Sequence, residues 1–319
     1  MGRIVCFIAA LAASGMLAAQ GFPNKPVTIV VGFEPGGGTD TTARILQKPL
    51  GDQLGQQVIV ENRAGAGGNI AVDYVAKSAP DGYTLVLANV GALSVNPHIL
   101  KTPYDPLKDL TPISMAAVFA NVLVVQPSLN IKTVADYVKL ARSKPDGVTY
   151  ASSGIGGAGH LAGELLKSMA KGTNLVHVPY KGGGPAMQGF LGTQVDSFFA
   201  TPISSISQIR AGRAIAVATT GSKRAALMPD VPTVAESGYP GYEALNWYGF
   251  VGPARMPKEV VERWNRELVK ALASPEAVAQ MHKTGVEPQS SSPAEFGKYI
   301  EREYKTWGRV VKEAGIKAQ

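Results

Sequence analysis

The chain has 319 residues, 45% of them hydrophobic and 17% charged, which is enough to bury a large core and to form two domains. Its formal charge of +7 comes from scattered Lys and Arg residues without interleaved aromatic residues, so a nucleic-acid-binding surface is not expected. The single cysteine, Cys6, excludes an internal disulfide and a metal centre built from several thiolates.

The first residues have the pattern of a secretory signal peptide. Arg3 and the amino terminus make a weakly positive start, residues 4–13 are apolar, and residues 14–21 are mostly small. The apolar stretch is shorter than the roughly 20 residues that span a bilayer, which makes a membrane anchor the less favoured interpretation. We therefore predict that residues 1–20, including Cys6, are removed and that the mature protein is secreted.

Predicted strands and helices alternate along the rest of the chain, which is typical of parallel sheets covered by helices. In the first part, strands are expected at residues 27–33, 57–61 and 83–88, and helices at 39–54 and 69–77. A loop rich in proline follows, with Pro97, Pro103, Pro106 and Pro112. The apolar run at residues 118–126 then predicts one fully buried strand.

The alternation restarts in the second part. Helices are expected at residues 134–143, 160–171 and 185–191, and strands at 148–151, 175–178, 196–200 and 215–220. A short strand at 247–251 precedes two amphipathic helices at 257–273 and 293–314. We predict an α/β protein of two lobes, each with a mixed or parallel sheet, and a ligand cleft between them. The first lobe would contain residues 21–121 and 248–319, and the second residues 122–247.

Three glycine clusters, at residues 36–40, 152–157 and 181–185, each stand between a predicted strand and a predicted helix. Glycine lets the backbone come close to a ligand, and the unpaired N–H groups at a helix start carry about half a positive charge, which suits an anion. None of the clusters carries a convincing catalytic group. The pattern therefore favours a receptor for a small carboxylate over an enzyme.

Two of the clusters imitate nucleotide-binding motifs. Gly38 occupies the position of the lysine that a phosphate-binding P-loop requires, so residues 32–39 offer no counter-ion to a terminal phosphate. Residues 154–159 match the dinucleotide glycine pattern, but the next strand runs into Pro179 and Tyr180 and has no acidic residue for the ribose. We therefore expect no nucleotide and no other cofactor.

The enzymatic alternative is a secreted α/β hydrolase that uses Ser152 or Ser153 with His160 and a carboxylate such as Asp196. The serine does not lie in a Gly-x-Ser-x-Gly elbow. His160 falls in the first turn of a predicted helix, where a histidine is more often a helix-start residue or a ligand contact than a general base. The other histidines show no metal-ligand spacing, so neither a catalytic residue nor a metal is expected.

Short motifs follow one another in a fixed order along the mature chain. They are GFEPGGGTD (32–40), AR (43–44), ENRAGAGG (61–68), APDGYTL (79–85), YASSGIG (150–156), HL (160–161), VPYKG (178–182), PDVPT (229–233) and WYG (247–249). Each is loose alone, but their number and order closely resemble the tripartite tricarboxylate transporter solute receptors, also called Bug proteins. The resemblance covers the chain from about Pro23 to its end.

The resemblance implies a two-lobed periplasmic binding protein of the type II, Venus flytrap kind. Such a receptor closes over a small organic carboxylate and delivers it to the large and small integral membrane subunits of a transporter. It is usually monomeric and holds the ligand with backbone amides and ordered water. Carried over to this chain, the ligand contacts would be Phe33, Gly36, Gly37, Gly38, Thr39, Asp40, Gly67, Gly68, Asn89, Ser152, Ser153, Gly154, Gly156, His160, Lys181, Thr201 and Asn246.

Two questions stay open at this point. A solute-sensing receptor coupled to signalling would have the same fold, and no motif names the carboxylate. Glu34 also stands where relatives usually have a small or apolar residue, and a carboxylate at the cleft mouth would repel an anion unless it faces solvent or meets a donor. We expect Glu34 to face solvent; the alternative is a ligand with one carboxylate, or with an amine or amide group near Glu34.

Overall fold

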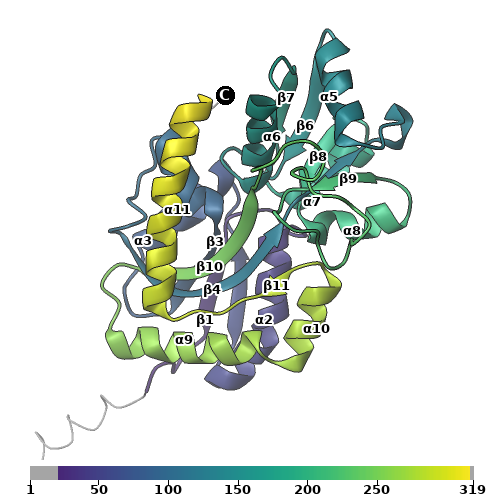
Figure 1. Ribbon diagram of the computed structural model, residues 1–319. Coiled ribbons are helices and arrows are strands. Elements are labelled where there is room, and N and C mark those ends of the chain that lie inside the picture. Colours follow the sequence, from purple (N-terminus) through teal and green to yellow (C-terminus); the bar gives the residue numbers. More distant parts are fainter. Residues whose placement is uncertain (1–20, 317–319) are drawn as a thin grey trace, which may run out of the picture.

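The computed structural model describes residues 21–316, and the predicted signal peptide lies outside them. Two β-sheets, each flanked by helices, form two lobes that lie one above the other in Figure 1. Two long strands run from the lower lobe toward the upper one. The predicted α/β class with two mixed sheets is therefore confirmed. None of the helices within residues 21–316 is both long and apolar enough to cross a membrane.

The first lobe is built on a six-stranded sheet with the order β11-β4-β10-β3-β1-β2. β1 pairs in parallel with β2 and β3, whereas β10 is antiparallel to both β3 and β4. The bounds are β1 Val27–Val31, β2 Val58–Asn62, β3 Thr84–Asn89, β4 Leu110–Ala120, β10 Leu245–Pro253 and β11 Glu287–Pro288.

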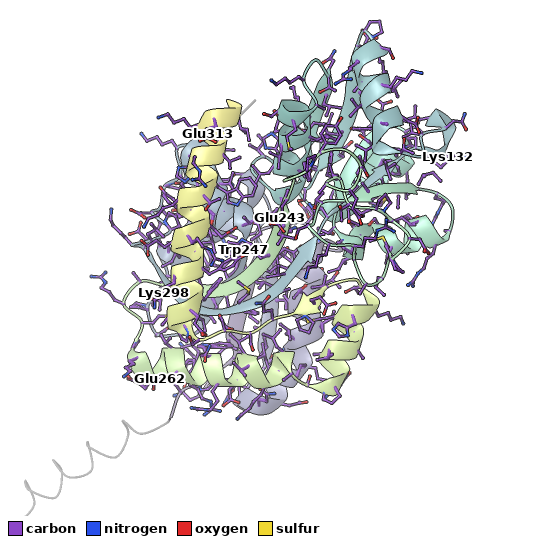
Figure 2. The ribbon with its side chains drawn as sticks, viewed as in Figure 1. Lys132, Glu243, Trp247, Glu262, Lys298 and Glu313 are labelled. Carbon is purple, nitrogen blue, oxygen red and sulfur yellow. The ribbon has the colours of Figure 1, made fainter. Side chains whose placement is uncertain are left out.

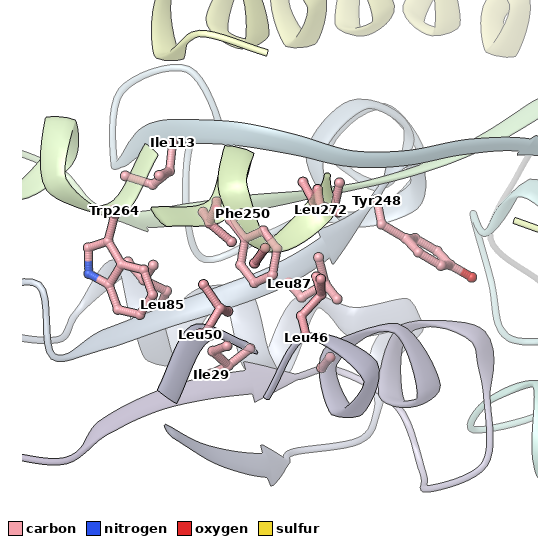
Figure 3. Close-up of a cluster of buried hydrophobic side chains, with 14 of the residues drawn as sticks. Ile29, Leu46, Leu50, Leu85, Leu87, Ile113, Tyr248, Phe250, Trp264 and Leu272 are labelled. Carbon is pink, nitrogen blue, oxygen red and sulfur yellow. The ribbon is translucent and has the colours of Figure 1, made fainter. Parts of the chain in front are cut away.

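Helices cover both faces of this sheet, which explains why its central strands are apolar almost throughout. On one face, Leu46 and Leu50 of α2 and Trp264 of α9 belong to one buried cluster with Ile29 of β1 (Figure 3). On the other face, Phe296 of α11 packs on β10. The bounds are α2 Gly38–Leu54, α3 Asn69–Ala76, α4 Asn96–Ile99, α9 Lys258–Leu272, α10 Pro275–Lys283 and α11 Pro293–Ala314.

Trp247 of β10, labelled beside α11 in Figure 2, packs against that helix. Its ring meets those of Phe296 and Tyr299 edge to face at centroid distances of 5.8 and 5.4 Å. Its Nε1–H donates to Glu303 at 3.2 Å. A buried indole of this kind contributes roughly 1.5–3 kcal/mol through its apolar area alone. The C-terminal helix therefore belongs to the first lobe, although the second lobe separates it from β1 to β4 in the sequence.

The second lobe is built on a five-stranded sheet with the order β7-β6-β8-β5-β9. β6 is parallel to β7 and β8, and β5 is antiparallel to β8 and β9. The strands are β5 Val122–Val125, β6 Val148–Ser152, β7 Leu175–Pro179, β8 Ser197–Ala200 and β9 Ile215–Thr219. The helices are α5 Val134–Ser143, α6 Ala158–Met169, α7 Gly183–Leu191 and α8 Pro202–Arg210.

The chain passes between the lobes at two adjacent points, Asn121 and Ala244. Thr220 connects them: its hydroxyl accepts the Asn121 N–H at 2.9 Å and donates to the Ala244 carbonyl at 2.7 Å. The Thr220 N–H donates to the Asn121 carbonyl at 2.9 Å. Because β10 pairs with β4 from Leu245 onward, we propose that the return crossing lies there and not at residues 247–248.

Two sequence predictions near the crossings were wrong. Residues 118–126 do not form one strand, because β4 ends at Ala120 in the first sheet and β5 begins at Val122 in the second. A continuous apolar run cannot reveal that its two halves are buried in different cores. Pro112 lies inside β4 and not in a loop, next to a β-bulge opposite Val251. A bulge is one of the few places where a strand tolerates a residue without an N–H.

Sequence reasoning missed α8 and α10. Each is preceded by a hydroxyl residue that caps the helix and is followed by proline at the first helical position: Thr201-Pro202 and Ser274-Pro275. A capping Ser or Thr followed by proline is a known signal for the start of a helix, so both helices could have been predicted from the sequence. Apart from the strands near the crossings, the other predicted elements begin and end within two residues of their positions in the structure.

Candidate functional site

A small cavity of about 10 Å³ lies between the two lobes. This volume holds about one water molecule and is far below the roughly 300–1,000 Å³ of a ligand pocket, so the lobes must move apart to admit a carboxylate. Residues of both lobes line it: Phe33, Gly37, Gly38, Thr39, Asn89, Asn246 and Tyr248 from the first, and Ser153, Gly183 and Thr201 from the second.

Three helices begin at this cavity. Gly38 and Gly183 are the first residues of α2 and α7, and Thr201 is the N-cap of α8. The N-caps of α2 and α7 are the glycines Gly37 and Gly182, whose lack of a side chain leaves the first N–H groups uncapped. None of the ten lining side chains is charged. The positive potential of the cavity therefore comes from helix N-termini, an arrangement that suits a small anion.

Eight of the residues named from the sequence line this cavity, namely Phe33, Gly37, Gly38, Thr39, Asn89, Ser153, Thr201 and Asn246. The other nine do not: Gly36, Asp40, Gly67, Gly68, Ser152, Gly154, Gly156, His160 and Lys181. Two lining residues, Gly183 and Tyr248, were missed. Both lie within motifs already noted, the glycine cluster at 181–185 and WYG at 247–249, so proximity to a motif was an available signal.

Asp40 shapes the loop before α2. Its carboxylate accepts the Gly36 N–H at 3.0 Å, the Arg44 guanidinium at 3.0 Å and the Asn62 amide at 2.9 Å. Burial alone would raise the pKa of Asp40, but these hydrogen bonds and the charge of Arg44 outweigh it and hold the pKa below its ordinary value. Asp40 thus remains ionised and holds Gly37 and Gly38 at the cavity.

Three of the five predicted site glycines outside the cavity wall, Gly67, Gly154 and Gly156, lie where the lobes meet. A Cβ on Gly67 would overlap the carbonyl of Ile155, and one on Gly156 would overlap the side chain of Asn96. A Cβ on Gly154 would lie 3.3 Å from the Cα of Gly67. These glycines therefore let the two backbones touch each other, and the structure has its lobes closed. Gly68 instead packs beneath Phe33, inside the first lobe.

The mouth of the cleft is closed by Glu34 and Lys181. The Glu34 N–H donates to the Lys181 carbonyl across the lobes at 2.9 Å. Both side chains line a groove on the outer surface, not the cavity, and Lys181 is exposed. The Glu34 side chain therefore lies outside the cavity in the closed form, on the side expected of a residue that faces solvent.

Ser152 and His160 do not form a hydrogen bond with each other within the described residues. Ser152 is fully buried and its Oγ lies 2.6 Å from Nε2 of His177. The same oxygen accepts the Gly154 N–H at 3.1 Å and donates to the Gly154 carbonyl at 3.0 Å. The single hydroxyl proton is thus engaged by the carbonyl, which makes His177 Nε2 the donor to Ser152.

The two histidines stack face to face inside the second lobe, with ring centroids 4.1 Å apart. Burial lowers the pKa of His160 to about 4, and burial together with the neighbouring His160 lowers that of His177 to about 3. Both rings are therefore neutral at pH 7. Nδ1 of His160 accepts the Gly156 N–H at 3.1 Å and so orders the glycine loop.

The carboxylate considered for a catalytic triad is also occupied elsewhere. Asp196 accepts hydrogen bonds from Lys144 Nζ at 2.7 Å and from the N–H and hydroxyl of Thr149 at 2.8 and 2.9 Å. Burial alone would raise the pKa of Asp196, but these partners lower it below the ordinary value. Among residues 21–316, no group of three or more His, Cys, Asp or Glu side chains could hold a metal ion.

Comparison with known proteins agrees with this geometry. The chain is 36% identical over 316 residues to the protein BugT of Bordetella pertussis. The matched region covers 98% of this chain and 96% of that protein. The solved structure of the periplasmic binding protein BugD is 34% identical, with a TM-score of 0.89 over 93% of this chain and 100% of that one.

Two further solved relatives contain carboxylates. One, from R. palustris, was solved with adipate and is 36% identical, with a TM-score of 0.89 over 93% of this chain and 99% of that one. The other is MatC from Rhodopseudomonas palustris with bound malate, 30% identical, with a TM-score of 0.86 over 91% of this chain and 100% of that one. The model of the tripartite tricarboxylate transporter family receptor matches residues 42–316. The chain therefore belongs to the tripartite tricarboxylate transporter receptor family.

Proposed function

We propose that this protein is a periplasmic receptor that captures a small organic carboxylate by closing its two lobes and delivers it to the large and small membrane subunits of a tripartite transporter. The observation that carries the proposal is the convergence of three helix N-termini, those of α2, α7 and α8, on one cavity with no charged side chain. Relatives with adipate or malate bound support the ligand class.

Closure is part of the proposal because each lobe supplies only part of the anion site. Gly38 and Thr39 come from the first lobe, whereas Ser153, Gly183 and Thr201 come from the second. A carboxylate that touches both sets binds the closed form better than the open one and shifts the equilibrium by that difference in affinity. We therefore expect small-angle X-ray scattering to give a smaller radius of gyration when ligand is present.

The protein is proposed to bind its ligand without converting it. Ser152 is fully buried and its proton is engaged by the Gly154 carbonyl, so it is not a free nucleophile. Within residues 21–316, His160 forms no hydrogen bond with Ser152, and Asp196 is held by Lys144 and Thr149. The hydrolase alternative therefore lacks the Ser152–His160 contact on which it depends, because Ser152 contacts the buried His177 instead.

The first test is a thermal-shift screen of the secreted protein, refolded to remove bound ligand, against mono-, di- and tricarboxylates, aromatic acids and amino acids. A ligand present at 100 times its Kd should stabilise the fold by about 2.7 kcal/mol and raise the melting temperature in a saturable way. Analysis of the ligand afterwards should recover it unchanged. Consumption of a compound would support the hydrolase, and no shift with any carboxylate would reject the receptor.

Localisation, assembly and delivery need separate measurements. We expect the protein in the periplasmic fraction without residues 1–20, as a monomer by size-exclusion chromatography with light scattering. Uptake of the identified carboxylate by cells should require both this protein and the two membrane subunits. If uptake continues normally without the protein while binding is intact, a sensory receptor coupled to signalling becomes the better function.

A further inference from the structure

Two polar side chains of the cavity wall have polar atoms without a partner. The Tyr248 side chain is 3% exposed, and no residue within 21–316 forms a hydrogen bond with its hydroxyl. Asn246 is 4% exposed, and its Oδ1 is buried without a hydrogen-bond partner in the described structure. A buried polar atom left unpaired costs roughly 1–3 kcal/mol, so the Asn246 oxygen calls for an explanation.

The Tyr248 hydroxyl lies at the start of α2. A Cβ on Gly38, the first residue of that helix, would overlap this hydroxyl, so the two groups are in contact. Figure 3 shows the Tyr248 ring leaving the row of packed side chains, with its oxygen pointing away from them. The ring itself is fixed edge to face against Phe119, at a centroid distance of 4.9 Å. The hydroxyl is therefore a fixed donor beside the uncapped N–H groups of α2.

Asn246 lies two residues before Tyr248 on β10, so both side chains point to the same face of the sheet, roughly 7 Å apart along the strand. Its amide nitrogen donates to Oδ1 of Asn121 at 3.4 Å, which orients the amide and leaves its own Oδ1 as an acceptor. Tyr248 is paired with Asn89 of β3 and Ala117 of β4, and Asn246 is paired with Phe119 of β4, so the sheet holds both groups in place.

We propose that Tyr248 and Asn246 form a specificity pair that selects carboxylates carrying a hydroxyl or ammonium group next to the carboxylate. The Tyr248 hydroxyl donates to the carboxylate held at the N-terminus of α2, and the Asn246 oxygen accepts from the neighbouring substituent. An unsubstituted dicarboxylate leaves the Asn246 oxygen unpaired, and this difference discriminates against it. This inference rests on the proposed function, because it assumes that a carboxylate occupies the cavity.

The test is isothermal titration calorimetry of the ligand-free protein with succinate, malate and aspartate, which differ only in a hydrogen, hydroxyl or ammonium on one carbon. The wild-type protein should bind malate or aspartate at least about tenfold more tightly than succinate. Tyr248→Phe should weaken binding of malate and aspartate roughly tenfold or more, because a hydrogen bond to a charged group is lost. Asn246→Leu should bring the affinities for the three ligands close together.

Tyr242→Phe is the matched control, because the Tyr242 hydroxyl donates to the Ala162 carbonyl at 2.8 Å in the core of the second lobe. It should lower the melting temperature and leave ligand preference unchanged. Tyr248→Phe should instead preserve the melting temperature of the ligand-free protein, since its hydroxyl has no partner in the described structure.

The outcomes separate the two proposals. A wild-type protein that binds succinate as tightly as malate and aspartate, or that binds only a carboxylate without such a substituent, would reject the specificity pair and leave the receptor standing. The specificity pair would also be rejected if Tyr248→Phe bound malate and aspartate as tightly as wild type does. The same holds if Asn246→Leu still preferred them over succinate. A wild-type protein that binds no carboxylate in the full panel would reject the proposed function, and the specificity pair with it.

Discussion

His160 and His177 make the stability of the second lobe dependent on pH. Their pKa values of about 4 and about 3 lie below the ordinary value of 6.5, because burial disfavours the charged ring. Between pH 6.5 and 4 the unfolded chain binds protons that the folded protein does not, so the free energy of unfolding falls as the pH falls. Each histidine contributes a loss of roughly 1.4 kcal/mol per pH unit in that window.

Urea unfolding at pH 7.5, 6 and 5 measures this effect. The loss of stability on acidification should be smaller in His177→Gln, which removes one of the two titrating rings. His282→Gln is the control, since His282 is exposed on α10. Equal pH dependence in wild type and His177→Gln would show that the buried pair does not govern acid stability.

Ser152 should matter for folding more than for binding. Ser152→Ala removes a buried hydroxyl that joins His177 to the Gly154 backbone, and we expect a loss of about 1–3 kcal/mol in the free energy of unfolding. The affinity for the carboxylate should change less than threefold, because Ser152 does not line the cavity. Loss of binding without loss of stability would contradict this assignment and place Ser152 in contact with the ligand.

The glycines at the ends of strands and the starts of helices control how far the lobes close. A Cβ on Gly184 in the first turn of α7 would lie 2.9 Å from the Pro35 carbonyl of the other lobe, and one on Gly91 would lie 3.0 Å from the Gly156 carbonyl. Neither has a positive φ, so an alanine is compatible with the local backbone. The main effect expected of either alanine is therefore a steric clash between the two lobes.

The double variant Gly91→Ala, Gly184→Ala should thus hinder closure. We expect its ligand affinity to fall about tenfold, and the decrease in radius of gyration on ligand addition to shrink in solution scattering. Gly51→Ala, inside α2 and away from the second lobe, is the control; it should bind normally and be slightly more stable, because alanine is the better helix former. Normal affinity and compaction in the double variant would show that the lobes do not need these contacts.

At the scale of the whole molecule, Thr220 joins Asn121 and Ala244, the two points where the chain passes between the lobes. Thr220→Val keeps the shape but leaves the Asn121 N–H and the Ala244 carbonyl with one hydrogen bond fewer, and both are buried. The free energy of unfolding should drop by roughly 1–3 kcal/mol or more. Denaturant titration measures it, with Thr111→Val as the control, because the Thr111 hydroxyl bonds only the Pro253 carbonyl within the first lobe. A loss no larger than that of the control would mean that the crossings are independent.

Local features of the chain were readable from the sequence. Strand and helix positions follow from hydrophobic periodicity and from glycine, proline and cap residues, which act within a few positions along the chain. The glycine loops at the starts of α2 and α7 could therefore be predicted as anion sites, and eight of the named residues do line the cavity. The resemblance to a receptor family placed these loops in two lobes that face each other.

The tertiary structure decided which glycines face the cavity and which face the other lobe. The sequence does not distinguish the roles of Gly38 and Gly67. Only the fold places Gly38 beside Tyr248 and Gly67 against Ile155. It also paired Ser152 with His177, 25 residues away on the neighbouring strand, and not with His160 on the adjoining helix. Such pairings depend on sheet register and on the contact between lobes, which join residues distant in the chain, so local patterns carry no signal for them.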